Sequence, residues 1–233
     1  MTSLAIARFV GIAGRLSPTD LLIEPGQAVA VIGPNGGGKT SLLRGLARTE
    51  DADGSVSVEG HDLDQASEAG RRRLLAFMPA SREAPWPIRV ADWIELGLSE
   101  PDVARCTALI RALELEPLVD RTIDRLSTGE RARAMLARAL AGKARLLLLD
   151  EPLSNLDPYW VLRTLDLLGE EARKGSTVMV ALHDIALVER FDRVLLVDHG
   201  RLVGDGLPPL LEDRLGALFG VRAAPGGGWQ IAR

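Results

Sequence analysis

A glycine-rich segment that contains one lysine has the composition of a phosphate-binding loop. It consists of Gly33, Pro34, Asn35, Gly36, Gly37, Gly38, Lys39, Thr40 and Ser41. Glycines let backbone N–H groups turn inward around phosphate oxygens, and a helix that follows points its positive end at the same anion. Lys39 can bridge the β- and γ-phosphates, the Thr40 hydroxyl can bind Mg²⁺, and Ser41 is placed for the α-phosphate. The alternative is an ordinary glycine-rich turn, which the flanking strand and helix patterns disfavour.

Two carboxylates follow a run of leucines. Leu146–Leu149 predicts a buried central strand, and Asp150 and Glu151 come directly after it. In an open parallel sheet, ligands bind at the carboxyl ends of the strands. Asp150 can therefore belong to a Mg²⁺ shell, and Glu151 can orient or deprotonate an attacking water. An acidic pair that only faces solvent is the alternative.

A second candidate anion site begins a helix. It consists of Ser127, Thr128, Gly129 and Glu130. Ser127 and Glu130 have the spacing of a capping box, which alone is weak evidence for function. The same geometry leaves helix N–H groups, a glycine and a hydroxyl facing outward, which is a phosphate-binding surface. Its position shortly before the acidic strand favours the functional interpretation.

Two further polar residues stand at the starts or ends of predicted elements. His183 follows the apolar run Thr177–Leu182 and is expected at the same sheet edge as Gly33 and Asp150. A partly buried structural histidine is the alternative. Asp157 precedes Pro158 and predicts the N-cap of a helix that extends to about Lys174.

The elements that must position these residues follow the pattern of an α/β protein with a mostly parallel sheet. Strands are predicted at Gln27–Ile32, Gly54–Gly60, Leu74–Met78, Arg145–Leu149, Thr177–Leu182 and Arg193–Val197. A helix is predicted over Thr40–Arg48, and the tail from Pro208 contains one short helix. From Val90 to about Leu140 the patterns are helical, which indicates a helical subdomain inserted between strands. We expect one domain, with a core at about 1–80 and 143–210, a helical subdomain at about 90–141 and a tail at about 208–233.

Composition limits the class of protein. The chain has 233 residues, 46% of them hydrophobic, so it can bury a sizeable core. The net charge is −4, which argues against a protein that grips nucleic acid through its overall charge. The single cysteine, Cys106, excludes an intrachain disulfide and suits a reducing cytosol. No uninterrupted apolar run approaches the ~20 residues that cross a bilayer, and Arg8 argues against a signal peptide.

Together these motifs resemble those of the ATP-binding subunits of ABC transporters. GPNGGGKT is similar to their Walker A motif, LSTGE to their LSGGQ signature and LLLLDE to their Walker B motif. The segment from Ser154 to Asp157 resembles the D-loop, and His183 stands at the position of the switch histidine. Order and spacing match over nearly the whole chain. The sequences LHD, RVLLVDHGRLVGDG and LFGV resemble importers of iron-siderophore, haem or cobalamin type.

The resemblance implies a P-loop NTPase core with an antiparallel β edge, using ATP and Mg²⁺, with Glu151 and His183 as catalytic residues. It implies a head-to-tail homodimer, in which Ser127–Glu130 and Asp157 of one chain complete the nucleotide site of the other. It also implies membrane permease subunits, in importers a separate substrate-binding protein, and a peripheral location at the cytoplasmic face of the inner membrane. An ABC exporter and a soluble ATP-driven switch on nucleic acid or ribosomes are the alternatives, and no nucleic-acid partner is expected.

The chain departs from the family pattern at several positions. Ala80 stands where the family usually has glutamine, and Thr128 replaces the first glycine of the signature. No aromatic residue near the N-terminus stands out as the stacking partner for adenine. Phe9 and Arg15 are the candidates. The stretch Ala80–Trp93 contains several prolines, so we expect an irregular loop that contacts the permease through Trp86. Trp86 packed inside its own subdomain is the alternative, and Arg71–Arg73 is expected to be an exposed segment before a strand.

Overall fold

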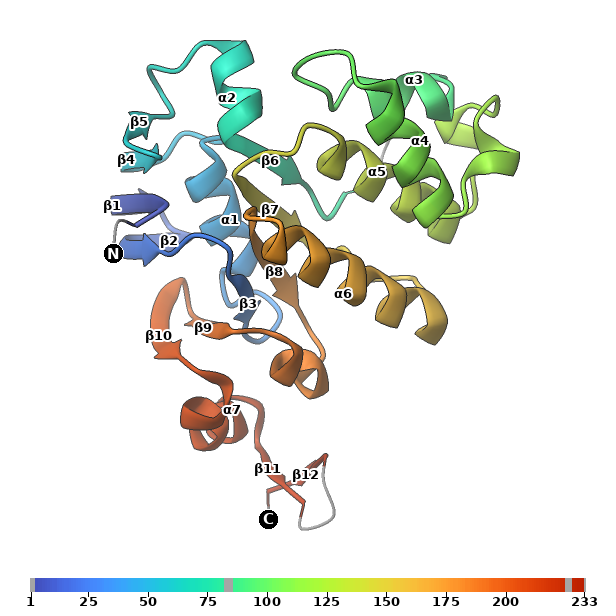
Figure 1. Cartoon of the computed structure of the whole chain (residues 1–233). Coiled ribbons are helices and arrows are strands. Elements are labelled where there is room, and N and C mark those ends of the chain that lie inside the picture. The colour runs from blue at the N-terminus through green and yellow to red at the C-terminus, as the bar shows by residue number, and fades with distance from the viewer. Residues whose placement is uncertain (1–2, 82–85, 225–227, 233) are drawn as a thin grey trace.

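A mostly parallel sheet occupies the centre of the computed structural model, which describes residues 3–81, 86–224 and 228–232 (Figure 1). The six strands run in the order β10-β9-β3-β8-β7-β6. Their bounds are β3 Ala28–Ile32, β6 Leu75–Met78, β7 Leu146–Asp150, β8 Thr177–Leu182, β9 Arg193–Asp198 and β10 Arg201–Gly206. Every neighbouring pair is parallel except the β9–β10 hairpin. The predicted α/β class and the predicted central strands are confirmed.

A second, antiparallel sheet covers one side of this core. Its strands run in the order β2-β1-β4-β5. Their bounds are β1 Ala5–Ile12, β2 Leu16–Ile23, β4 Asp53–Val58 and β5 His61–Asp62. Helix α1, Lys39–Ala47, buries Leu42, Leu43 and Leu46 in one apolar cluster with residues of both sheets. The loop that starts α1 is thereby held between two sheets.

Helices cover the opposite face of the central sheet (Figure 1). They include α3 Val90–Glu95, α4 Val103–Ala112, α5 Thr128–Ala141 and α6 Pro158–Arg173. The expectation of an irregular loop from Ala80 to Trp93 is wrong at its end, because α3 begins at Val90 and buries Trp93. Residues 82–85 lie outside the described part. Trp86 is 67% exposed, so the alternative of packing inside its own subdomain is wrong.

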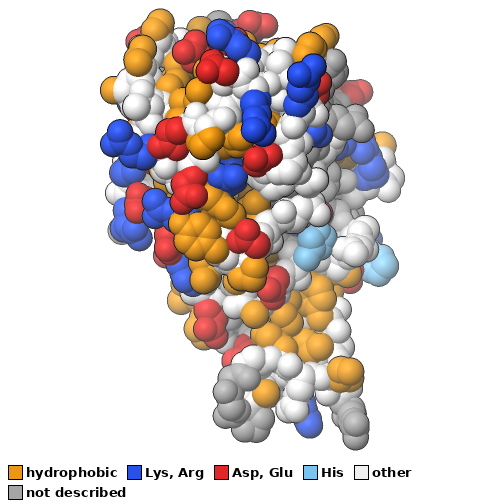
Figure 2. All heavy atoms as spheres, turned by 90° about the vertical axis from the view of Figure 1, so that its right-hand side faces the viewer, with side chains coloured by type: hydrophobic (Ala, Val, Ile, Leu, Met, Phe, Trp, Pro, Cys, Tyr) orange, Lys and Arg blue, Asp and Glu red, His pale blue; other side chains and the backbone are white. Residues whose placement is uncertain are grey.

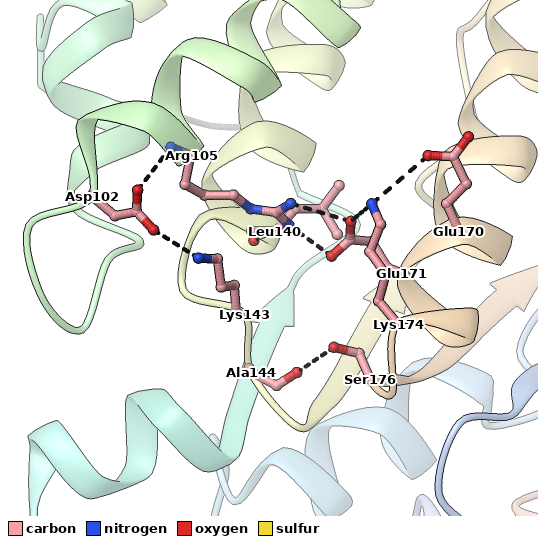
Figure 3. Close-up of polar contacts among 9 residues, drawn as sticks. All are labelled: Asp102, Arg105, Leu140, Lys143, Ala144, Glu170, Glu171, Lys174 and Ser176. Carbon is pink, nitrogen blue, oxygen red and sulfur yellow. Dashed lines mark hydrogen bonds and ion pairs between the residues drawn. The ribbon is translucent and has the colours of Figure 1, made fainter.

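A buried ion-pair network joins α4 to the end of α5 and to α6 (Figure 3). The Arg105 guanidinium donates to the Glu171 carboxylate at 2.7 Å and to the Leu140 carbonyl at 2.9 Å. Lys174 donates to the same carboxylate at 3.1 Å. Nearby, Lys143 donates to Asp102 at 2.7 Å. Helix α5, which begins at the LSTGE motif and is called the signature helix below, leads into β7. The network therefore fixes the C-terminal end of this helix beside the strand that carries Asp150.

The arginine cluster is structured rather than simply exposed. It lies in helix α2, Glu68–Leu74. Arg71 is half-buried and donates to the carbonyls of Leu63 and Arg48, each at 3.1 Å. Only Arg72 and Arg73 match the expectation of exposure.

The tail lies below β10 (Figure 1), and its Leu211 and Leu215 belong to the main hydrophobic core. It contains the 3-10 helix η4 Pro208–Leu211, α7 Glu212–Phe219, and the antiparallel pair β11 Val221–Ala223 and β12 Trp229–Ile231. The predicted tail helix is confirmed, whereas the hairpin is not evident in the sequence because its strands are only three residues long.

Candidate nucleotide-binding site

A cavity of about 1130 Å³ lies where β3, β7 and β8 end at their carboxyl ends. Residues of the glycine-rich loop, of the acidic strand end and of the switch position meet in its lining. These are Asn35, Gly36, Gly38, Lys39, Thr40, Ser41, Glu151 and His183. Gly33, Pro34 and Gly37 belong to the same loop but do not line the cavity. The structure therefore gathers side chains from three strand ends into one space that is large enough for a nucleotide.

Two glycines of the loop are required by close backbone contacts with the β9–β10 hairpin. A Cβ atom at Gly33 would lie 1.9 Å from the Val197 carbonyl oxygen. Gly38 has φ of 107° and would place a Cβ 2.9 Å from Gly200 Cα. The hairpin is bonded to the loop through the Gly200 N–H, which donates to the Gly37 carbonyl at 2.8 Å. The β9–β10 hairpin therefore packs against the glycine-rich loop and stabilises its conformation.

Lys39 is buried and bonded to its own loop. Its Nζ donates to the carbonyls of Gly33 at 2.8 Å and Pro34 at 3.1 Å. Burial lowers the pKa of Lys39, while the charges of Glu151 and Asp150 act in the opposite direction. An ammonium that is satisfied only by neutral carbonyls in a low-dielectric site gains from an anionic ligand. Phosphate oxygens would supply that charge.

Asp150 and Thr40 fit a magnesium ion. The Thr40 hydroxyl donates to Asp150 Oδ1 at 3.2 Å, and Asp150 Oδ2 is buried with no hydrogen-bond partner among the described residues. Burial raises the pKa of Asp150, and repulsion from Glu151 adds to this effect. A cation would satisfy the orphaned oxygen, and hydroxyl and carboxylate oxygens are hard donors of the kind that Mg²⁺ prefers. The described residues contain no cluster of three or more His, Cys, Asp or Glu that could hold a metal alone, so phosphate and water would supply the other ligands.

Glu151 and His183 are in direct contact. The His183 Nε2 atom lies 2.5 Å from Glu151 Oε1. Glu151 has φ of 53°, a left-handed conformation that turns the chain sharply at the end of β7. Both side chains are partly exposed, and histidines lie exposed on the face shown in Figure 2 (pale blue). A carboxylate oriented by an imidazole at the mouth of the cavity has the arrangement of a general base.

The signature residues lie elsewhere on the chain. Ser127 and Glu130 form the predicted capping box, with the Ser127 N–H donating to Glu130 Oε2 at 2.8 Å. Neither they nor Thr128 and Gly129 line the cavity of their own chain. Asp157 does not line it either, and its carboxylate caps α6 by accepting the Trp160 N–H at 3.0 Å. Within one chain, Ser127, Glu130 and Asp157 cap the starts of helices, and none of the signature residues reaches the cavity.

The lining also includes residues that motif reasoning did not assign to the site. They come from the β1–β2 turn and from the tip of the β9–β10 hairpin, and include Ile12, Ala13, His199 and Arg201. Of the two candidate partners for the adenine ring, Arg15 lines the cavity. Phe9 does not, and its side chain is 68% exposed on β1. The Asp198-His199-Gly200 turn has a signal in the sequence, since it directly follows the predicted strand Arg193–Val197 and contains a glycine.

A P-loop between a parallel strand and a helix, facing an acidic strand end, defines a nucleotide-binding protein of the P-loop class. The family described as ABC transporter matches residues 16–154. The hemin import ATP-binding protein HmuV of Streptomyces coelicolor is 38% identical and covers 85% of this chain and 75% of its own. That of Pseudomonas fluorescens is 37% identical, covering 88% and 87%.

Solved structures agree on the fold. An ATP-binding subunit of an ABC transporter superposes with a TM-score of 0.81 at 22% identity, over 93% of this chain and 95% of its own. A dimeric ATP-binding cassette in a post-hydrolysis state, bound to ADP and Pi, gives a TM-score of 0.78 at 21% identity, over 88% and 98%. The chain belongs to the ABC transporter family, as one of its ATP-binding, ATP-hydrolysing subunits.

Proposed function

We propose that this chain hydrolyses ATP to power an importer of haem or a related metal chelate. The substrate class rests on the relatives named for hemin import, two of which align with this chain over 75% and 87% of their own lengths. The observation that carries the ATPase mechanism is the contact of Glu151 with His183 beside Lys39 and Thr40 in one cavity.

The residues of the site have separate roles in this proposal. Lys39 exchanges the carbonyls of its own loop for phosphate oxygens, aided by the N–H groups that start α1. Thr40 and Asp150 hold Mg²⁺, which neutralises phosphate charge when bound. Glu151 accepts the proton of the attacking water, and His183 orients Glu151.

The signature helix completes the site of a second copy. Ser127–Glu130 present helix N–H groups away from their own cavity, so a head-to-tail homodimer places them over the partner's nucleotide. Asn155 supports this geometry, because its carbonyl lies 3.7 Å from a Cβ built at Gly129, which sets the D-loop beside the signature. ATP buried between two chains would drive closure, and hydrolysis would release it.

A groove at the end of β6 and the exposed Trp86 side chain are proposed to contact the permease. Met78, Pro79, Trp93 and Leu96 line a hollow of about 180 Å³ between the end of β6 and the helical subdomain. The Arg138 guanidinium stacks over the Trp93 ring at 4.4 Å and forms part of its wall. No helix in the described part of the chain is both long and apolar enough to cross a bilayer. In this proposal the subunit is peripheral, at the cytoplasmic face of the inner membrane, and a separate substrate-binding protein delivers the chelate.

Copurification from the native host tests the proposal. A tagged chain should bring down a polytopic membrane protein, and the complex should release phosphate from Mg²⁺-ATP at a rate that a haem-loaded binding protein increases. Recovery of RNA or DNA in place of a membrane protein would support the soluble switch. In vesicles that carry the ATPase subunit on the outside, ATP-driven uptake of substrate into the vesicle would support the exporter.

A further inference from the structure

A second large cavity lies between the tail and the segment that follows His183. Its volume is about 870 Å³, which is the size of a small-molecule site. The 3-10 helix η3, Ile185–Arg190, forms one wall, and α7 and β12 form the opposite walls. Phe191, Leu215 and Trp229 give it an apolar lining with two aromatic rings. Figure 2 shows apolar side chains (orange) over this lower part of the molecule, with acidic side chains (red) beside them.

The polar side chains that line this cavity are hydrogen-bond acceptors without cationic partners. They are Gln27, Glu189, Asp192 and Glu212, and no lysine or arginine is among the described lining residues. None of the three carboxylates forms an ion pair within the described part of the chain. Elsewhere, carboxylates such as Glu50 and Glu171 are paired with arginine. The acceptors of this cavity therefore present uncompensated negative charge.

Gln27 and Asp192 line the same cavity next to β3. The Gln27 Nε2 atom donates to Glu24 at 3.0 Å, whereas Gln27 Oε1 is buried and has no hydrogen-bond partner among the described residues. Asp192, which is exposed, accepts the Ala28 N–H at 2.8 Å, and this bond fixes its carboxylate beside the cavity. Both residues therefore connect the cavity to the start of β3.

We propose that this cavity binds an amphipathic organic cation, a protonated amine or ammonium with an apolar body. The cation would face Glu189, Asp192 and Glu212, and the body would lie against Phe191 and Trp229. The three carboxylates are exposed beside the apolar lining, so they attract a cation through solvent and this attraction should weaken with salt. Aromatic faces add a cation–π contribution. An anion of the same shape has no partner on this lining.

The site is placed to regulate the nucleotide cavity. His183 precedes Asp184, which caps η3 by accepting the Ala186 N–H at 2.9 Å. Ile185 and Ala186 line the second cavity directly. A ligand that shifts η3 would therefore move the backbone next to the histidine that contacts Glu151. This regulatory part rests on the proposed ATPase function, whereas the binding does not.

Calorimetric titration of the full-length chain without nucleotide tests binding. The probes are 4-phenylbutylammonium and 4-phenylbutanoate, which share a body and differ in charge. We expect saturable binding of the cation only, and a Glu189→Gln/Glu212→Gln variant should bind it roughly fivefold more weakly. Asp213→Asn removes one exposed charge beside Glu212 without touching the cavity and should bind the cation as the parent chain does.

Several outcomes would overturn the site. They are equal binding of both probes, no saturation at millimolar cation, and an equal loss in Asp213→Asn. Binding of a lysine-rich amphipathic peptide with no binding of the small cation would instead make the cavity a protein-docking groove. For the regulatory part, saturating cation should change steady-state phosphate release about twofold in the parent chain, and the double variant should need roughly fivefold more cation for the same change. If the chain shows no ATPase activity, the proposed function fails while the binding result still decides the site.

Discussion

The His183 imidazole lies 2.5 Å from the Glu151 carboxylate, across the gap between two adjacent parallel strands. Glu151 follows β7 in a left-handed conformation, and His183 follows β8 directly. The contact therefore depends on strand register as well as on side-chain type. It links the residue proposed to take a proton with the residue proposed to orient it.

Glu151→Gln should keep ATP binding and lose most turnover. Glutamine has almost the same shape but cannot accept the proton of the attacking water, so we expect a decrease of roughly a hundredfold or more. Steady-state phosphate release and nucleotide titration measure the two effects separately. Size-exclusion chromatography with ATP should also show an accumulated dimer. Turnover at the parent rate would show that Glu151 is not the base.

Lys39→Ala should weaken ATP binding roughly ten- to a hundredfold. The ammonium is held by two neutral carbonyls at present, and its bonds to phosphate would be charge-assisted. Titration with a fluorescent ATP analogue measures the loss. Lys143→Ala, which removes a lysine that is bonded to Asp102 away from the cavity, serves as the control. Equal affinities for parent and Lys39→Ala would remove the phosphate-loop assignment.

The sequence predicted the central strands and the separate motifs because their signals are local. Four consecutive leucines before Asp150 specify a buried strand, and glycines before Lys39 specify a phosphate turn. The antiparallel sheet was largely missed, since β1 and β2 have bulges and Phe9 adopts a left-handed conformation within β1. Their hydrophobic alternation is therefore broken.

The remainder of the cavity lining could not be predicted for a related reason. Arg15 and His199 stand in two turns that are distant in sequence, and the Ser17 N–H joins them by donating to the Gly200 carbonyl at 2.7 Å. Such a contact depends on how the two sheets pack. The residue spacing within either turn therefore does not predict that the two turns meet.

Arg105→Met should lower the free energy of unfolding by about 3 kcal/mol, because it leaves the buried Glu171 carboxylate without its main partner. Arg105→Met/Glu171→Met should recover most of that loss. Urea denaturation measures both. Lys174→Met removes only the exposed partner and should cost less than about 1 kcal/mol. A double variant as unstable as the single one would show that the ion pair itself is not the cause.

The same pair predicts a pH dependence. Burial raises the pKa of Glu171, but the bonds and charges of Arg105 and Lys174 outweigh it and hold the pKa below its usual value of 4.5. A lowered folded-state pKa gives stability that is present above the unfolded pKa and is lost as pH falls through the folded one. The stability difference between the parent chain and Glu171→Gln should therefore shrink as pH falls below about 4.5.

Trp86→Ala should release the permease without reducing the ATPase activity of the isolated subunit. The ring is 67% exposed, so its removal leaves no cavity in this chain, and an aromatic anchor at an interface often carries a large share of binding energy. Pull-down of the membrane partner measures the effect. Leu22→Ala, another exposed apolar residue on β2, is the control. Retained complex formation in Trp86→Ala would place the contact elsewhere.

Ala80→Gln should raise Mg²⁺-dependent ATPase activity. Ala80 lies two residues after Met78, whose partner in the parallel register is Leu149, two residues before Glu151. Position 80 is thus level with the catalytic end of β7, and Ala80 has no side-chain donor or acceptor to offer there. A glutamine side chain from this position would reach the metal and the attacking water. The lost polar contact is of the kind worth on the order of 1–3 kcal/mol, so basal turnover should rise roughly ten- to a hundredfold in the variant.

Phosphate release at saturating ATP, with and without the membrane partner, measures the turnover of Ala80→Gln. Ala80→Asn, which shortens the amide by one methylene, should gain less, and an unchanged or lower rate in Ala80→Gln would mean that another residue already fills this role.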